Sequence, residues 1–319
     1  MAQVLIAGAS PAKLPASAQE VTPPRRPRWR RDSFTSTWFV LPILLVFVVL
    51  YLIPLGQSVF YSFTDYNGYS PDVRWVGIDN YVRIFRDSSM LSALGFTLFY
   101  AIVTTVLVTA LAIPLALALN RRFVGRGFVR SVFFFPAVPS VAVLGLVWTF
   151  ILSPLGSGVI NSVLGWVGIA PVPWLADETL AQLSVILVAV WAQTGWHAMI
   201  YLAYLQSIPA DIFEASKLDG AGAWQEFRSL TLPLLTPAIT VSQLLLLTGG
   251  LKVYDLPFTL THGGPGFATR TLTQSIIENG IAQSDIGKAS ALSVLFLLAV
   301  GAVIALQLVL SRRLEARYS

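Results

Sequence analysis

The chain has 319 residues, of which 55% are hydrophobic and only 12% are charged, and its mean hydropathy is +0.71. A soluble globular domain carries roughly 25% charged residues, so this composition excludes one water-soluble core and indicates a membrane protein. The net charge of +5 does not predict nucleic-acid binding, because the basic residues cluster beside apolar runs, where topology rules put them. The absence of cysteine excludes disulfides and thiolate metal sites.

Residues 1–34 form the first region, in which Ala, Pro, Ser and Arg dominate. The region ends in a basic run, Pro23-Pro24-Arg25-Arg26-Pro27-Arg28-Trp29-Arg30-Arg31. Such a composition predicts a disordered cytoplasmic tail, whose juxtamembrane arginines attract anionic lipid headgroups. Residues 35–319 are predicted to form the transmembrane domain.

Six apolar stretches follow, each close to the roughly 20 residues that a helix needs to cross a bilayer. Helices are expected because backbone polar groups in lipid must be satisfied within the segment. The predicted spans are Trp38–Phe63, Leu91–Leu119, Val132–Leu152, Leu180–Gln206, Leu234–Tyr254 and Ala289–Leu310. Prolines inside several spans, Pro136 and Pro139 among them, are compatible either with a bundle that bends around a pathway or with simple packing kinks.

Lysine and arginine predict the orientation of these spans. With the N-terminus inside, 15 of the 21 Lys and Arg residues fall in inside segments and 6 in outside segments. The positive-inside rule therefore predicts that both termini are cytoplasmic. The segment between the fourth and fifth spans, residues 207–233, is then cytoplasmic as well. Outside, the Gly- and Pro-rich loop from Ser153 to Asp177, with Trp166 and Trp174, suits short interfacial helices.

The cytoplasmic segment 207–233 resembles the EAA loop of bacterial ABC importer permeases. The residues that carry the likeness are Glu214-Ala215-Ser216, Asp219-Gly220-Ala221 and Leu232-Pro233. Ser216 departs from the usual pattern, which has Ala at that position. The resemblance implies a short coupling helix that docks on an ATPase subunit, and it assigns these eight residues to ATPase coupling.

The likeness covers nearly the whole chain after residue 38. Trp75–Tyr81 and the Gly-Gly-Pro loop Thr261–Thr269 resemble loops of carbohydrate-type permeases, the MalF/UgpA-like branch of binding-protein-dependent transport inner membrane components. That branch imports oligosaccharides or glycerol phosphate esters. The implied fold is an all-α polytopic membrane protein of six transmembrane helices with the MetI-like permease topology.

The resemblance also implies an assembly in the cell membrane. Its partners would be a second permease subunit, two ATPase subunits, an extracytoplasmic substrate-binding protein and membrane lipid. ATP and Mg²⁺ would bind only the ATPases, so no cofactor is expected in this chain. The implied function is the pore of a sugar or oligosaccharide importer that works by alternating access. A glycerol-phosphate-type importer of the same family is the alternative.

The residues of the loop support a docking role on physical grounds. Ser207 can cap a helix whose first turn holds Pro209. Gly220 and Gly222 permit a sharp turn between two short helices. Glu214 offers a charge to a basic residue across an interface.

The sequence argues against catalysis in the chain itself. A P-loop requires Gly, four residues and then Gly-Lys-Ser/Thr, and the nearest approach, Gly280 to Gly287-Lys288-Ala289, has the wrong spacing and lacks the hydroxyl. An ion-coupled carrier is a rival of a different class. Such carriers bury ionisable residues in their spans, and only Lys252, Asp255 and His197 are candidates here.

The substrate pathway is predicted by alignment with the same family. Distance from Glu214 places Gln193 and Trp196 at pathway positions, and interhelical packing is an equally open role for both. Distance from the Gly-Gly-Pro loop places Gly250 and Val253 there, with Lys252 and Asp255 adjacent. Lys252 would favour an anionic substrate, or its ammonium would reach the outer interface.

Overall fold

The computed structural model describes residues 32–318, which are helical apart from turns, loops and one isolated β-bridge. The chain divides into two units, Met1–Ile53 and Pro54–Ser319. The described part of the first unit is one continuous helical stretch, α1 (Asp32–Phe47) followed by the π-helical turn η1 (Val48–Leu52). The predicted tail, residues 1–34, lies outside the described residues except for its last three, which already belong to α1.

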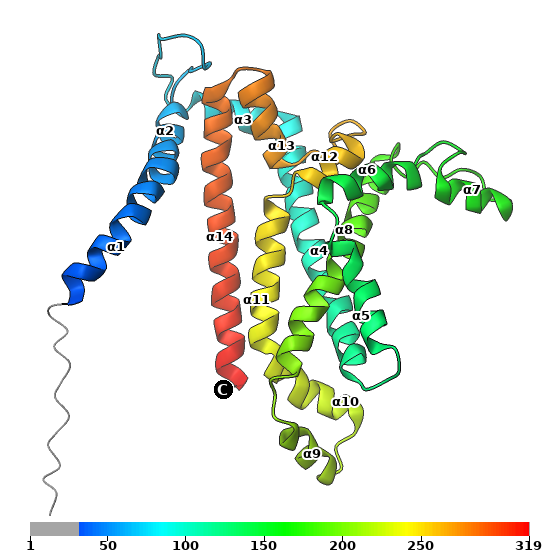
Figure 1. Ribbon diagram of the computed structural model, residues 1–319. Coiled ribbons are helices and arrows are strands. Elements are labelled where there is room, and N and C mark those ends of the chain that lie inside the picture. Colours follow the sequence, from blue (N-terminus) through cyan, green and yellow to red (C-terminus); the bar gives the residue numbers. More distant parts are fainter. Residues whose placement is uncertain (1–31, 319) are drawn as a thin grey trace, which may run out of the picture. The chain divides into compact units, whose positions relative to one another are not determined.

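The second unit is a helical bundle, shown in Figure 1. Its elements in chain order are α2 (Ile53–Tyr61), α3 (Asp79–Arg86), α4 (Ser88–Asn120), α5 (Arg126–Phe134), η2 (Phe135–Ala137), α6 (Val141–Ile151), α7 (Val159–Trp166), α8 (Glu178–Leu205), α9 (Ala210–Leu218), α10 (Ala223–Glu226), η3 (Phe227–Thr231), α11 (Leu232–Leu251), α12 (Asp255–Thr261), α13 (Leu272–Ile277), η4 (Glu278–Ala282) and α14 (Ile286–Tyr318). Figure 1 shows α9 and α10 at the same end of the bundle as the C-terminus, and α3, α6, α7, α12 and α13 at the other end.

Five helical stretches of the described residues are long and apolar enough to cross a membrane. They are Val40–Tyr61, Ser88–Asn120, Glu178–Leu205, Ala223–Leu251 and Ile286–Ser311. A sixth is present if a bent pair, Arg126–Ala137 and Val141–Ile151, is taken as one span. The all-α fold with up to six spans agrees with the prediction from apolar run lengths.

The third span, predicted over Val132–Leu152 with Pro136 and Pro139 as possible kinks, is broken into two helices. Its two helices meet at an angle of 92°. Pro136 and Pro139 lie at the break, and proline has no N–H to continue a helical ladder. Ser140 then starts α6 afresh, because its hydroxyl accepts a hydrogen bond from the Val143 N–H at 3.3 Å.

The fifth span also ends earlier than predicted. α11 stops at Leu251, and Lys252, Val253 and Tyr254 connect it to α12 rather than extending the span. The Lys252 backbone leaves the helical region with ψ near 7°. The tail of the predicted span is therefore a turn at the α12 end of the bundle.

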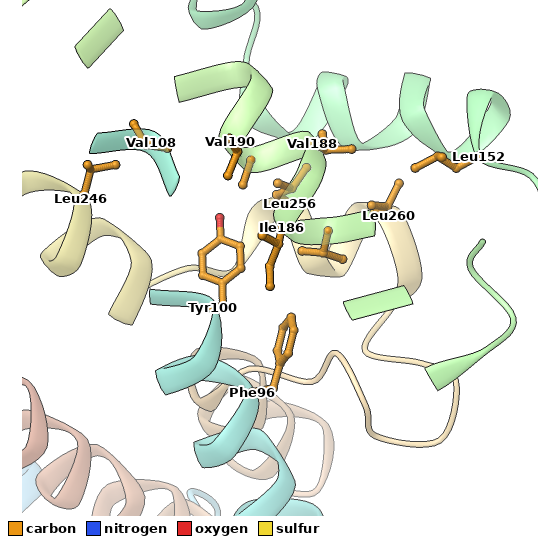
Figure 2. Packing of buried hydrophobic residues seen from close by; sticks show 12 residues of the cluster. Phe96, Tyr100, Val108, Leu152, Ile186, Val188, Val190, Leu246, Leu256 and Leu260 are labelled. Atoms are coloured by element: carbon orange, nitrogen blue, oxygen red, sulfur yellow. The ribbon is translucent and has the colours of Figure 1, made fainter. Parts of the chain in front are cut away.

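The bundle core is built where α4, α8, α11 and α12 meet. Figure 2 shows its buried side chains, with Tyr100 and Phe96 from α4 beside Ile186 from α8 and Leu256 from α12. A second buried cluster lies along the same helices toward α9 and includes Leu119, Tyr201 and Leu235. α8 contributes side chains to both clusters, at successive levels along its length.

Candidate functional site

A cleft of about 340 Å³ opens where the third span bends. The volume lies within the roughly 300–1,000 Å³ typical of small-molecule sites. The break supplies Pro136, Ala137, Pro139, Val141 and Leu144, α8 supplies Ala192, Gln193, Trp196 and His197, and α11 supplies Leu245. The two predicted pathway residues of α8 therefore line one cleft, together with the prolines that create the bend.

The polar groups of this cleft stand on α8 at helical spacing. Trp196 and His197 follow Gln193 at i+3 and i+4, one turn along α8, and all three line the cleft. The ring centroids of Trp196 and His197 are 4.7 Å apart, in an edge-to-face arrangement of 81°. An aromatic face beside an amide can bind a ligand whose ring carries hydroxyl groups: the aromatic side chain stacks on the ring, and the amide forms hydrogen bonds with the hydroxyl groups.

His197 is a member of the site that sequence reasoning did not assign to it. The imidazole is buried, and its Nδ1 lies 2.7 Å from the hydroxyl of Ser242 on α11. The same hydroxyl accepts a hydrogen bond of 2.8 Å from Tyr201. Ser242 thus fixes the ring orientation of His197 and ties α8 to α11 behind the cleft. The sequence signal that could have assigned His197 to the site is its i, i+4 spacing from Gln193, which places both residues on one face of a helix.

Close helix packing positions α8 against the third span. A Cβ added at Gly195 would meet the backbone carbonyl of Phe133, so only glycine permits this approach of α8 to α5. Small residues serve this purpose widely between membrane helices. Gly195 therefore permits the close contact between α8 and α5.

The other predicted pathway residues lie elsewhere. A Cβ at Gly250 would stand 2.9 Å from the Ala101 Cα, so this glycine serves the contact between α11 and α4. Val253 packs against the first core cluster. Lys252 and Asp255 are exposed around the α11–α12 turn, without an ion-pair partner among residues 32–318. None of the four lines the cleft described above, and their part in transport stays a prediction.

The segment 207–233 forms a second distinct feature, at the opposite end of the bundle from α12. It consists of α9, a turn, α10 and the π-helical turn η3, and Figure 1 shows α9 and α10 projecting beyond the long helices. Glu214 and Ala215 are exposed on α9, whereas Ser216 is buried and its hydroxyl donates to the Phe213 carbonyl at 3.0 Å. The serine that departs from the family pattern thus satisfies its own hydroxyl locally.

The turn after α9 is a Schellman motif. The Ala221 N–H donates to the Ser216 carbonyl at 3.0 Å, and the Gly220 N–H donates to the Lys217 carbonyl at 3.1 Å. Gly220 has φ of +77°, the left-handed region that favours glycine. Gly222 has φ of −72°, which any residue adopts. The predicted sharp turn therefore depends on Gly220 alone of the two glycines.

The cap of α9 differs from the prediction, and the segment also exposes large apolar side chains. Ser207 does not cap α9, because its hydroxyl donates to the Tyr204 carbonyl at 2.7 Å and Pro209 occupies the cap position. Large apolar side chains are strongly exposed here: Leu218 is 90% exposed and Trp224 70%. Asp219 and Gly220 lie in the turn between Leu218 and Trp224. Leu232, by contrast, packs on the second core cluster. Pro233 follows Leu232 in the first turn of α11, where proline is well tolerated.

At the α12 end an ionic cluster joins α14 to the start of α4. The Lys288 ammonium lies 2.9 Å from the Asp87 carboxylate, which also accepts hydrogen bonds from the N–H and hydroxyl of Ser89. Burial raises the pKa of Asp87, but the hydrogen bonds from Lys288 and Ser89 outweigh it and lower the pKa from 3.8 to about 2. Arg83 pairs with Asp285 at 2.6 Å nearby.

Among residues 32–318, no group of three or more His, Asp or Glu side chains is placed to hold a metal ion.

Comparison with known proteins identifies relatives over most of the chain. Residues 108–317 match the model of a family described as the binding-protein-dependent transport system inner membrane component. The multiple sugar-binding transport system permease protein MsmF of Streptococcus mutans is 33% identical over 279 residues, which cover 88% of this chain and 95% of MsmF. The diacetylchitobiose uptake system permease protein NgcF of Streptomyces coelicolor is 33% identical over 306 residues, covering 91% and 86% of the two chains.

A solved structure has a similar fold. A chain of a bacterial ABC transporter involved in the import of the acidic polysaccharide alginate superposes with a TM-score of 0.77 at 23% identity, covering 88% of this chain and 96% of that one. Fold, family match and relatives agree with one another. The chain therefore belongs to the family of binding-protein-dependent transport system inner membrane components, as a multi-pass protein of the inner membrane.

Proposed function

We propose that this chain is one of two pore subunits of an ATP-driven importer for a sugar or oligosaccharide. Like its relatives, the chain is a transport component and not an enzyme. The observation that carries the substrate class is the cleft at the bend, where Trp196 and Gln193 offer an aromatic face and an amide beside the buried His197. The relatives MsmF and NgcF are named for sugar and diacetylchitobiose uptake, which supports the same class.

An extracytoplasmic binding protein would deliver the substrate, and two ATPases would dock at the segment 207–233. The second permease, the ATPases and the ATP and Mg²⁺ on them are parts of this proposal. Leu218 and Trp224 present apolar surface at that segment, and exposed Glu214 presents a charge beside it. Apolar anchors together with a charge suit a specific protein interface. The ATPase would bias two states of the pore, because a partner shifts a conformational equilibrium only by binding one state better.

The first experiment tests the substrate class. The complex is reconstituted in liposomes with its binding protein, and ATP-dependent uptake of a panel of labelled mono- and oligosaccharides is measured. Sugar uptake that falls severalfold on Trp196→Ala supports the proposal. Uptake of phosphate esters without any uptake of sugars would overturn it.

The second experiment tests the docking segment by reversing a charge. Losing one partner of a buried interfacial charge pair costs about 2–5 kcal/mol, so Glu214→Lys is expected to lower co-purification of the ATPase strongly. Asp211→Lys is the matched control, because Asp211 is an exposed acid on the same helix. Its reversal loses a helix-dipole interaction of about 0.3–1 kcal/mol. Equal effects of the two variants would contradict docking through Glu214.

A third experiment tests the proposed orientation, in which both termini and the segment 207–233 are cytoplasmic. The native chain has no cysteine, so single cysteines report without background. A cysteine replacing Ser229 is expected to react only with a reagent supplied from the cytoplasmic side, and one replacing Asn67 only from outside. Outside labelling of Ser229→Cys would refute the orientation.

A further inference from the structure

We propose that α7 is a membrane-interface anchor, whose outer face inserts into the headgroup region of the leaflet at the α12 end of the bundle. Val159, Val163 and Trp166 follow the spacing i, i+4, i+7, which places them on one stripe of the helix. Their side chains are 55%, 50% and 83% exposed. A row of large apolar side chains open to solvent marks a surface that binds something.

The opposite face of α7 is fixed to the protein. Ile160 packs against the first core cluster, and Asn161 is buried beneath the helix. The Asn161 amide donates to the carbonyls of Ser153 and Val172 at 3.1 and 3.0 Å, and its oxygen accepts from the Val172 N–H and the Trp174 indole at 3.0 Å each. This side chain holds both arms of the loop together, so the apolar stripe has a defined direction.

The loop leaves and rejoins the bundle at the level where spans end. Leu152, directly after α6, belongs to the first core cluster, and Trp174 and Leu175 pack on the same cluster as the chain returns to α8. Figure 1 shows α7 extending sideways from the bundle at this end. This position suits a short helix that lies along a membrane surface.

Charge distinguishes lipid from a protein as the occupant. The 25 residues from Leu152 to Ala176 contain no charged side chain, whereas the loop from Ser62 to Asp87 at the same end contains seven. A soluble partner that docks and dissociates would be steered by charges at its contact surface. Tryptophan is enriched at the headgroup level of membranes, where its amphipathic ring is at home, and Trp166 stands there with aliphatic neighbours.

The test uses four single-cysteine variants of the full chain, Val159→Cys, Val163→Cys, Gly165→Cys and Trp166→Cys, each carrying an environment-sensitive fluorophore. Gly165 is the matched control, because it is exposed on a different face of α7 and no heavy atom lies within 4 Å of the position that a Cβ would occupy there. The protein is placed in phospholipid nanodiscs without a binding protein, so that both membrane surfaces are open to quenchers.

We expect the labels at 159, 163 and 166 to be quenched by lipids brominated near the headgroup. Insertion of about 5–10 Å should also lower iodide quenching of these labels by at least about threefold relative to the label at 165. Equal access of iodide to all four labels would overturn the proposal. Protection that appears only after a soluble binding protein is added would overturn it as well, and would assign the stripe to that protein.

Discussion

Gly220 offers the sharpest test of the docking segment, because its role reduces to one backbone angle. Its φ of +77° lies in the left-handed region, and no heavy atom stands within 4 Å of the position of an added Cβ. A Cβ at this site meets no atom beyond the adjacent residues, so the cost considered for Gly220→Val is conformational. That cost is about 1–2 kcal/mol for a residue with a Cβ. The equilibrium constant for forming the turn should then fall about 5- to 30-fold.

The expected result is weaker binding of the ATPase to an otherwise intact permease. The measurement is the ATPase concentration needed for half-saturation of the purified permease. It should rise by up to the same factor, because the apparent affinity falls with the fraction of permease in which the turn is formed. Gly220→Asn is the matched control, because asparagine tolerates the left-handed conformation and should bind almost as the native chain does.

Hydrogen exchange reports on the turn independently of any partner. The Ala221 N–H donates to the Ser216 carbonyl, and Gly220→Val should speed its exchange while Gly220→Asn should not. Unchanged exchange and unchanged ATPase binding in the valine variant would refute the reasoning. Faster exchange with unchanged binding would leave the turn established and remove its role in docking.

Three further predictions concern the cleft and the ionic cluster. Trp196→Ala should lower uptake severalfold and leave basal ATP hydrolysis unchanged. Leu187→Ala, at an exposed position of α8 that does not line the cleft, should leave both unchanged, and a similar loss in both variants would point to a packing defect. Ser242→Ala removes the partner of a buried imidazole nitrogen and should lower stability by about 1–3 kcal/mol, seen as a lower melting temperature in detergent; a native melting temperature would contradict the hydrogen bond. The pKa of Asp87 is lowered to about 2 in the folded chain from 3.8, so its stabilisation is complete above pH about 4 and is lost as the pH falls toward 2. With screening at this partly exposed site the loss should be about 1 kcal/mol, and it should become smaller in Lys288→Met, in which only the hydrogen bonds from Ser89 remain.

The existence and approximate ends of the apolar helices were predictable from local sequence alone. A run of about 20 apolar residues is sufficient to predict a span, because the hydrocarbon thickness sets the length whatever the neighbours are. The turn at Gly220 was also predictable, since a glycine just after a short polar helix is a local signal for the left-handed cap. The same local signal gave a wrong prediction at Gly222, which is also a glycine after a short helix but has an ordinary negative φ.

Which residues meet one another depends on how the helices pack. The prolines of the third span were visible as possible kinks, but the 92° bend and the cleft it opens toward α8 follow from contacts between helices. His197 finds Ser242 45 residues further along the chain, and Gly250 lies against Ala101 instead of in the cleft. The physical reason is that a helix apolar around its whole circumference carries little information about which face turns inward. In lipid, contacts between such helices are chosen by close packing and interhelical hydrogen bonds, which depend on pairs of residues distant in sequence.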